Sequence, residues 1–395
     1  MKRPIVVYLD SCDYSNFSYS RLDALQAEQL NALRAIKNDD SVIFVYSGAH
    51  ISEMSPLEQK YADSALVRTR LMVELCGRST MISYDRLMKA ELKCLLDHDP
   101  KPVSVISNSG EWFPELGSLV SPLEELKLNK MMGDELDKQN LNRKERRMAK
   151  AIMLKGSGFR GDYEKRFGNL DTGEVISRIP MRPDDAIVIN KYLIGKATRK
   201  QADDAFLESL RDPTFMSQWF SSRYAQMSTI AEWIRRPAQE LLNNCNQTLK
   251  DFSEKLIGLD GADRARAIKG VSGEGWRNYK LQGVLNIVNK LILWYWPGAR
   301  LCVDVALIEK YCPGIWVCVN AFYDSIQKSI GARGRSLKSS DFVDMIHSLY
   351  VPYVSFFRAD RYMCGILQPL ARGFETRIVA SSAELVPLLY GELRR

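Results

Sequence analysis

Four acidic residues have the type and the positions of a site for a divalent metal: Asp10, Glu53, Asp344 and Asp360. Carboxylates that lie within a few ångströms of one another repel, so at least one would stay protonated unless a cation lay among them. A set of oxygen ligands suits Mg²⁺ or Mn²⁺, which leave coordination positions for water and for a substrate phosphate. Such a centre activates a bound water and neutralises charge during phosphodiester hydrolysis.

Each of these acids also has a structural interpretation. Asp10 follows an apolar run and suits a turn, and Asp360 precedes a predicted helix and suits its N-cap. Glu53 and Asp344 are expected in the first turns of helices, where a carboxylate stabilises the helix dipole. Asp341, on the same predicted helix as Asp344, suits capping better than metal binding. The hypothesis of a metal site therefore depends on all four acids lying together, and not on any one of them.

The two ends of the chain contain the elements that would position these acids. Residues 4–9 and 41–48 are continuous apolar runs, as expected of strands buried on both faces. Helices are predicted over 20–37 and over 52–77, the second with a break near Pro56, and residues 102–108 suit a third strand or a loop. The C-terminal third alternates in the same way, with a helix over 341–350, a strand over 353–359, a helix over 361–371, a strand over 376–380 and a last helix from Ser381.

Strands that alternate with helices predict a parallel sheet. The intervening sequence favours helices, so we predict one α/β domain made of residues 1–110 and 300–395, split by a mostly helical insertion over 111–299. Ligands of open parallel sheets bind beyond the carboxyl ends of the strands. The four acids are predicted to meet at that edge.

Positive charge is concentrated in residues 140–170, which account for most of the net charge of +7. A basic cluster suits the phosphate backbone of a nucleic acid, although it also suits a solvated helix followed by a Gly-rich loop. Trp112 and Phe159 are either core residues or exposed aromatics that stack on bases. The residues that we expect to contact nucleic acid are Arg143, Lys144, Arg146, Arg147 and Lys150.

Other site classes have little support. The eight cysteines contain no CxxC pair, and the chain has only three histidines, so a zinc site is not expected. The apolar run 4–9 is short for a signal peptide. Polar residues interrupt the apolar stretch 283–298, which falls short of the roughly 20 residues of a membrane span. We therefore expect a cytoplasmic protein without a membrane partner.

The segments "VYLDSCDYSNF", "YSGAHISEM" and "VDMIHSLYVPYVSFFRADRYM" resemble the PIN-like nucleases in the order of their acids. That family has a strand-ending Asp followed by a hydroxyl residue, as in Asp10-Ser11, and a Glu after the second strand, matched by Glu53. It also has a helix that opens Asp-x-Ile-His, matched from Asp344, and an Asp after a hydrophobic strand, matched by Asp360. Two positions depart from the pattern: Arg358-Ala359 replaces a common Thr, and Cys12 replaces a common Asn.

The resemblance covers residues 1–110 and 300–395 and implies an endoribonuclease that depends on Mg²⁺ or Mn²⁺. The four acids would hold the metal, RNA is the preferred substrate and DNA an alternative one. A non-catalytic protein that binds nucleic acid or assembles with other proteins is the alternative from another class. The sequence does not decide whether the protein forms a homo-oligomer or has a regulatory partner protein, or whether one or two metal ions bind.

Overall fold

The structure is a computed structural model of the 395-residue chain. It describes residues 3–19, 21–56, 59–99, 103–114, 142–145, 147, 181–193, 197–222, 254, 259–302, 304–331 and 339–394.

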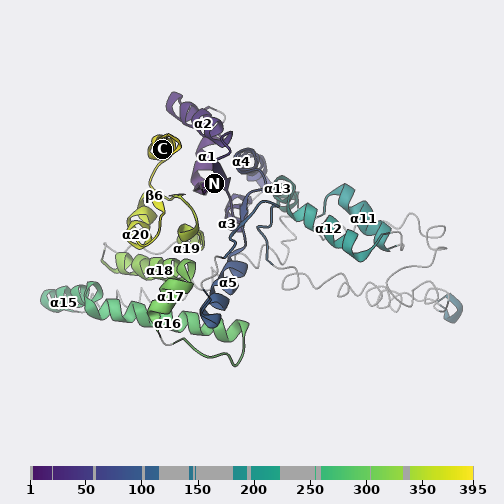
Figure 1. Ribbon diagram of the computed structural model, residues 1–395. Coiled ribbons are helices and arrows are strands. Elements are labelled where there is room, and N and C mark those ends of the chain that lie inside the picture. Colours follow the sequence, from purple (N-terminus) through teal and green to yellow (C-terminus); the bar gives the residue numbers. More distant parts are fainter. Residues whose placement is uncertain are drawn as a thin grey trace.

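A four-stranded parallel sheet joins the two ends of the chain (Figure 1). Its strands, in spatial order, are β2 (Val42–Val45), β1 (Ile5–Tyr8), β5 (Phe356–Arg358) and β6 (Arg377–Val379). In the central pair, Val7 of β1 lies opposite Phe356 of β5, and Tyr8 lies opposite Phe357. The predicted α/β fold, with a parallel sheet formed by both ends of the chain, is confirmed.

Both faces of the sheet are buried, as the continuous apolar runs predict. Successive side chains of a strand point to opposite faces, and Val7 and Phe356 belong to one core cluster while Tyr8 and Phe357 belong to the other. The first cluster is covered by α2 (Ala24–Lys37), α4 (Ala62–Cys76) and α21 (Ser382–Leu393). The second is covered by α5 (Tyr84–Asp97), α18 (Pro313–Gly331) and α20 (Arg361–Ala371).

Two predictions for the N-terminal third are confirmed in part. The segment predicted as a helix over 52–77 with a break near Pro56 is two helices, α3 (Gly48–Met54) and α4, and the chain between them includes Pro56, which disfavours a continuous helix. Among the described residues 103–108, Ile106 and Ser107 form a strand, β4, but it pairs antiparallel with β3 (Thr80–Met81) and not with the parallel sheet. The start of that run alternates between apolar and polar residues, which suits a strand with one buried face.

Helices dominate the described part of the middle segment, as predicted. They are α11 (Pro183–Leu193), α12 (Arg199–Leu210), α13 (Pro213–Ser222), α15 (Gly261–Ser272) and α16 (Glu274–Tyr295), and α17 (Val305–Tyr311) follows them. These helices are not separate from the sheet domain: α13 packs against α4, and α16 packs against α18. The limits predicted for the insertion remain predictions.

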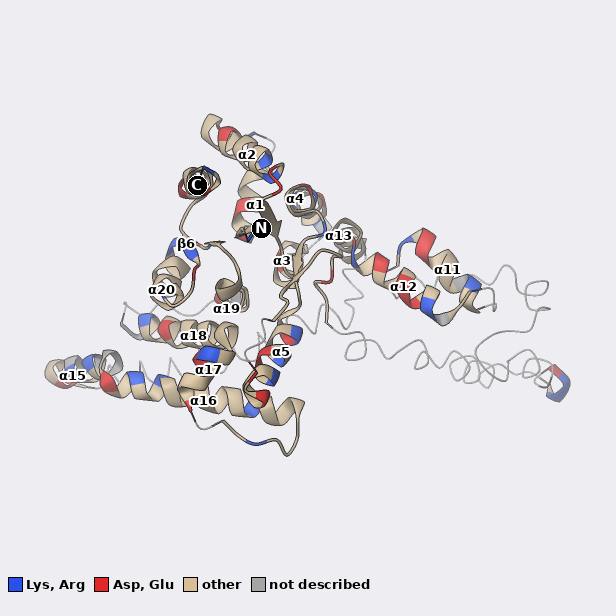
Figure 2. Cartoon of the chain, viewed as in Figure 1, with Lys and Arg blue, Asp and Glu red and all other residues tan. Residues whose placement is uncertain are grey.

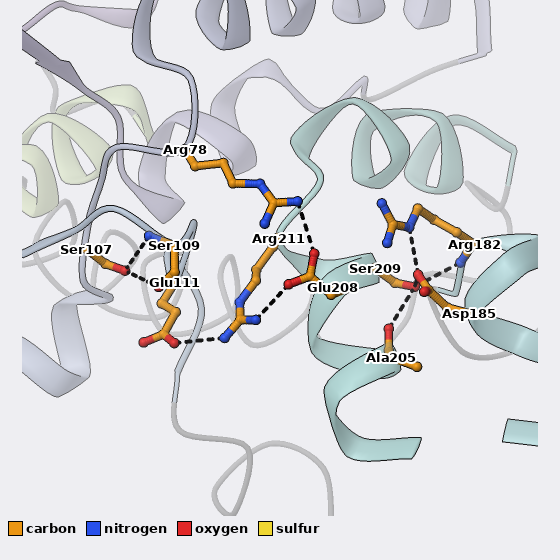
Figure 3. A network of polar contacts seen from close by, with 10 residues as sticks. All are labelled: Arg78, Ser107, Ser109, Glu111, Arg182, Asp185, Ala205, Glu208, Ser209 and Arg211. Carbon is orange, nitrogen blue, oxygen red and sulfur yellow. Dashed lines mark hydrogen bonds and ion pairs between the residues drawn. The ribbon is translucent and has the colours of Figure 1, made fainter. Parts of the chain in front are cut away.

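Ion pairs also attach the middle segment to the N-terminal third (Figure 3). Arg78, after α4, lies 3.0 Å from Glu208 of α12. Arg211 bridges Glu208 at 2.8 Å and Glu111 at 2.9 Å, so one guanidinium connects α12 with the segment after β4. Nearby, Trp112 is 2 % exposed, and its indole N–H donates to the carbonyl of Leu210 at 2.9 Å.

Among the described helices, none is by itself long and apolar enough to cross a membrane. Only α17 and α18 together, a pair bent by 118°, have the length and composition for it.

A buried carboxylate of α5 caps the N-terminus of α18. Glu91 is 0 % exposed and accepts hydrogen bonds from the backbone N–H groups of Gly314, at 2.7 Å, and Ile315, at 3.0 Å. The hydroxyl of Tyr353 also donates to it. A helix N-terminus attracts negative charge, and its first N–H groups have no partner within the helix. Glu91 thus supplies a cap from another element.

Glu91→Ala is expected to lower the free energy of unfolding by roughly 2–4 kcal/mol, because two buried backbone donors lose their acceptor. Urea denaturation of wild type and variant measures the difference. Glu74→Ala is the control, because Glu74 is exposed and its pair with Arg34 is worth about 1 kcal/mol or less. Equal losses in the two variants would contradict the capping role of Glu91.

Candidate metal centre

Two of the four predicted acids follow the central strands of the sheet. Asp10 comes after β1 and is the N-cap of α1 (Ser11–Phe17), and Asp360 comes after β5 and is the N-cap of α20. Because β1 and β5 are neighbouring parallel strands, both acids lie at the carboxyl edge of the sheet. The strand order 2-1-5-6 also changes direction between β1 and β5, and open sheets bind ligands at such a switch point.

The other two acids come from helices that pack together beside that edge. Asp344 lies on α19 (Ser339–Ser348), and Glu53 lies on α3. The predictions that Glu53 and Asp344 lie in the first turns of their helices are wrong. Helix α3 begins at Gly48, so Glu53 lies in its last turn, and α19 begins at Ser339, so its first turn contains Asp341 and not Asp344. A negative charge is disfavoured at a helix C-terminus, so stabilisation of the helix dipole does not explain Glu53.

The four acids act on one another electrostatically. Burial is the main cause of a raised pKa of Asp344, which reaches about 8. Glu53, Asp10 and Asp360 raise this pKa further, and His347 opposes them. The pairing of β1 with β5 and the packing of α3 against α19 bring these residues, far apart in sequence, to the same edge of the sheet.

A chain of hydrogen bonds fixes Glu53. Its carboxylate lies 3.0 Å from the Nε2 atom of His347, and the Nδ1 atom of His347 contacts the hydroxyl of Tyr8. That hydroxyl is also 2.7 Å from Oγ of Ser47. Burial alone would raise the pKa of Glu53, but the hydrogen bond and charge of His347 outweigh it and the pKa is lowered. Burial likewise opposes the charged form of His347, yet Glu53 raises the pKa of this imidazole. Each residue thus favours the charged form of the other.

Two of the acids have capping roles as well. Oδ1 of Asp10 accepts a hydrogen bond from the backbone N–H of Cys12 at 2.8 Å, and Oδ1 of Asp360 accepts one from Met363 at 2.7 Å. The prediction that Asp360 suits an N-cap is thus confirmed, whereas Asp10, expected in a turn, is an N-cap as well. Capping does not exclude metal binding, because each capping bond uses one carboxylate oxygen and leaves Oδ2 for another ligand.

A buried arginine lies beside the four acids. Arg358 is 8 % exposed, and its guanidinium lies 3.2 Å from Oδ1 of Asp13, which is 2 % exposed. Burial raises the pKa of Asp13 to about 7, Arg358 opposes the rise, and Asp10 adds to it. Sequence reasoning did not predict this pair, although an arginine within the apolar run 353–359 indicates that a partner is needed.

The donor set suits a hard cation, but its geometry is not yet that of a metal site. Among the described residues, no group of three His, Cys, Asp or Glu side chains is placed to hold a metal ion. In the same part of the chain, no lysine or arginine forms an ion pair with Asp10, Glu53, Asp344 or Asp360. The buried Oγ of Ser11 lies beside Glu53, and its hydrogen bond helps to lower the pKa of that carboxyl. Carboxylates that repel one another are what a bound cation would neutralise.

The predicted nucleic-acid contacts are only partly within the described residues. Arg143, Lys144 and Arg147 are exposed there, whereas Arg146, Lys150 and Phe159 lie outside. On the described helices, Lys and Arg are mixed with Asp and Glu, as on α5, α12 and α16 (Figure 2). The idea that Trp112 is an exposed aromatic is wrong, because this indole is buried between the first third of the chain and α12.

Comparison of the chain with protein-family models, curated proteins and solved structures gives no match.

Proposed function

We propose that this chain is a metal-dependent endoribonuclease with a PIN-like domain, whose centre consists of Asp10, Glu53, Asp344 and Asp360. The observation that supports the proposal is geometric: Asp10 and Asp360 follow the neighbouring parallel strands β1 and β5, and α3 and α19, which carry Glu53 and Asp344, pack together beside that edge. This edge is a switch point of a parallel sheet, where ligands bind. A protein that needed these acids only as helix caps would have no reason to gather them.

The residues of the site have distinct roles in this proposal. The four carboxylates would hold Mg²⁺ or Mn²⁺, which lowers the pKa of an attacking water and neutralises charge on the phosphate. His347 and Tyr8 position Glu53, since they fix its carboxylate through a hydrogen-bonded chain. Arg358 holds Asp13 in an ion pair at the edge of the site, where it also acts on Asp10. The segment 140–170 would contact the RNA backbone and lies mostly outside the described residues.

A cleavage assay tests the proposal. Single-stranded and duplex oligonucleotides, each as RNA and as DNA, are incubated with the full chain in Mg²⁺, Mn²⁺ or EDTA. We expect Mn²⁺-dependent cleavage of RNA with internal products. Preferential cleavage of DNA would favour the alternative nuclease. Binding without cleavage in either metal would favour a non-catalytic nucleic-acid-binding protein and contradict the proposal.

The two roles of Asp360 are separable by substitution. Asp360→Asn should retain the N-cap of α20, since Asn caps as well as Asp, but should remove a carboxylate from the centre. We expect normal thermal stability and at least tenfold slower cleavage. Asp360→Ala should be equally slow and also less stable by about 1 kcal/mol. If Asp360→Asn cleaves RNA normally, Asp360 is a cap only.

A further inference from the structure

A second buried histidine, His50, lies beside His347, with the two ring centres 4.7 Å apart. His50 is 0 % exposed, and its Nε2 atom is 2.9 Å from the carbonyl oxygen of Leu9. Its Nδ1 atom is 3.1 Å from the backbone nitrogen of Ser47. A carbonyl oxygen only accepts and a backbone N–H only donates, so the imidazole is neutral and carries its proton on Nε2. Both ring nitrogens thus have partners within the protein.

Burial and packing fix the ring of His50 in this state. Burial, and after it the charge of His347, lower the pKa of His50 to about 3, so the ring stays neutral at the pH of a cleavage assay. Its centre is 4.8 Å from that of the Tyr8 ring and 5.7 Å from that of the Tyr14 ring. His50 therefore has one orientation and one set of hydrogen bonds.

The two hydrogen bonds of His50 differ in what they join. The bond from Ser47 is local, because Ser47 is the N-cap of α3 and His50 is its third helical residue, the place of Glu or Gln in a capping box. This bond orients the ring. The bond to Leu9 instead joins α3 to the residue between β1 and Asp10. Only the bond to Leu9 connects two elements.

This connection lies where the pairing of β1 with β2 ends. Tyr8 and Val45 are the last paired residues of the two strands. Tyr46, which follows β2, bridges to Thr80 of β3 instead. At the point where the chain enters α3, the side chain of His50 therefore supplies a hydrogen bond back to the end of β1.

The bond to Leu9 places two of the predicted metal ligands. On one side, Leu9 directly precedes Asp10. On the other side, Glu53 follows His50 by three residues, about one turn of α3, so both side chains lie on the same face of this helix. A displacement of α3 relative to β1 would therefore change the distance between the carboxylates of Asp10 and Glu53.

We propose that His50 is a positioning residue of the metal centre, which sets the separation of Asp10 and Glu53 through its hydrogen bond to the carbonyl of Leu9. This role rests on the metal centre of the proposed function. Residues that orient the ligands of a metal ion matter nearly as much as the ligands, and their loss typically weakens metal binding by roughly 10–100-fold.

Two amide variants separate positioning from packing. His50→Gln can keep both hydrogen bonds, because its carbonyl accepts from the N–H of Ser47 and its NH₂ group donates to Leu9. His50→Asn has the same amide on a side chain one methylene shorter, so it can keep the local bond but should lose the bond to Leu9. Titration of the full chain with Mn²⁺, followed by the EPR signal of the free ion, measures the affinity. We expect binding roughly tenfold or more weaker in His50→Asn and within about threefold of wild type in His50→Gln.

Glu91→Ala is the control for stability. It also removes buried hydrogen bonds to two backbone groups, but those lie at the N-terminus of α18. It should lower the melting temperature without changing the affinity for Mn²⁺. If His50→Asn behaves in the same way, with a lower melting temperature and the Mn²⁺ affinity of wild type, His50 is a core residue and the positioning role is overturned.

The tautomer of His50 provides a test in the wild-type protein. ¹⁵N NMR distinguishes a proton on Nε2 from one on Nδ1. The chain has only three histidines, and spectra of His50→Gln and His98→Gln assign their signals. We expect the proton of His50 on Nε2. A proton on Nδ1 alone would leave the carbonyl of Leu9 without its donor and would overturn the positioning role.

The outcomes separate the role of His50 from the proposed function. If wild type binds Mn²⁺ and cleaves RNA, and His50→Asn equals it in both, the positioning role is overturned and the nuclease proposal stands. If wild type binds Mn²⁺ without cleaving RNA, the nuclease proposal is overturned, whereas weaker Mn²⁺ binding by His50→Asn still supports the positioning role. If wild type neither binds Mn²⁺ nor cleaves RNA, both are overturned.

Discussion

Asp344→Asn is expected to abolish metal-dependent cleavage of RNA and to raise the melting temperature of the metal-free protein at pH 8.5. The loss of activity follows from the position of Asp344, the carboxyl on which the charges of Glu53, Asp10 and Asp360 all act. The gain in stability follows from the same repulsion, because Asn has a similar shape and no charge.

The sign of the pH dependence follows from the raised pKa of Asp344, about 8 in the folded protein. An unfolded Asp has a pKa of about 3.9, so the folded state binds the proton more tightly and wild type loses stability as the pH rises from about 4 to about 8. Asp344→Asn has no carboxyl at this position and should not lose stability in this way as the pH rises. Its advantage should be on the order of 2 kcal/mol at pH 8.5, less than the full pKa shift implies because the carboxyl is partly exposed to solvent. The advantage should disappear near pH 4.

Thermal melts of both proteins between pH 4 and pH 8.5, with and without Mn²⁺, measure these effects. Mn²⁺ should stabilise wild type more than Asp344→Asn. Asp23→Asn is the control, because Asp23 is an exposed N-cap of α2 away from the four acids, and Asn retains the cap. A large drop in stability in Asp344→Asn at all pH values would show that the carboxylate has a structural partner and is not strained by repulsion.

The sequence was sufficient to predict the sheet. The continuous apolar run 4–9 has few alternatives to a strand buried on both faces, and acids that follow parallel strands lie at one edge of the sheet. Asp10 and Asp360 could therefore be placed without coordinates. The N-cap role of Asp360 was predictable for the same reason, because a strand that leads into a helix is followed by a capping residue.

The surroundings of the acids could not be predicted in the same way. Whether Glu53 begins or ends a helix depends on where α3 starts, and nothing local distinguishes a helix from Gly48 from one starting at Ser52. The pairing of Glu53 with His347 joins residues that are almost a chain length apart, so it depends on tertiary packing. The sequence left Trp112 as either a core residue or an aromatic that stacks on bases, and the choice depends on α12, which covers it in the fold.

Arg358→Met is expected to lower the free energy of unfolding by roughly 3–5 kcal/mol at pH 8, the usual cost of breaking a buried ion pair by removing one partner. Arg358 and Asp13 are both buried, and the guanidinium also donates to the carbonyl of Ala359. In the variant, the Asp13 carboxylate would remain buried beside Asp10 without a compensating charge. Met preserves the apolar volume of the side chain, so the loss should come from electrostatics and hydrogen bonding.

The cost should shrink as the pH falls. The pKa of Asp13 in wild type is about 7, above the value of about 3.9 for an unfolded Asp, so protonation of this group favours the folded state below pH 7. Without Arg358, which opposes the rise, the pKa should be higher still. At pH 5 both proteins have a mostly protonated Asp13, and the variant should lose only the hydrogen bonds of the guanidinium, about 1–2 kcal/mol.

Urea denaturation at pH 5 and pH 8 provides the comparison, with Arg377→Met as the control. Arg377 pairs with Glu392 at 2.9 Å but is 47 % exposed, so its loss should cost about 1 kcal/mol or less at either pH. If Arg358→Met is equally destabilised at both pH values, Asp13 does not titrate between them and its raised pKa is wrong. If instead the variant is as stable as wild type at pH 8 and gains affinity for Mn²⁺, then Asp13 is a metal ligand that Arg358 otherwise occupies, and the centre at the carboxyl edge of β1 and β5 extends to a fifth acid.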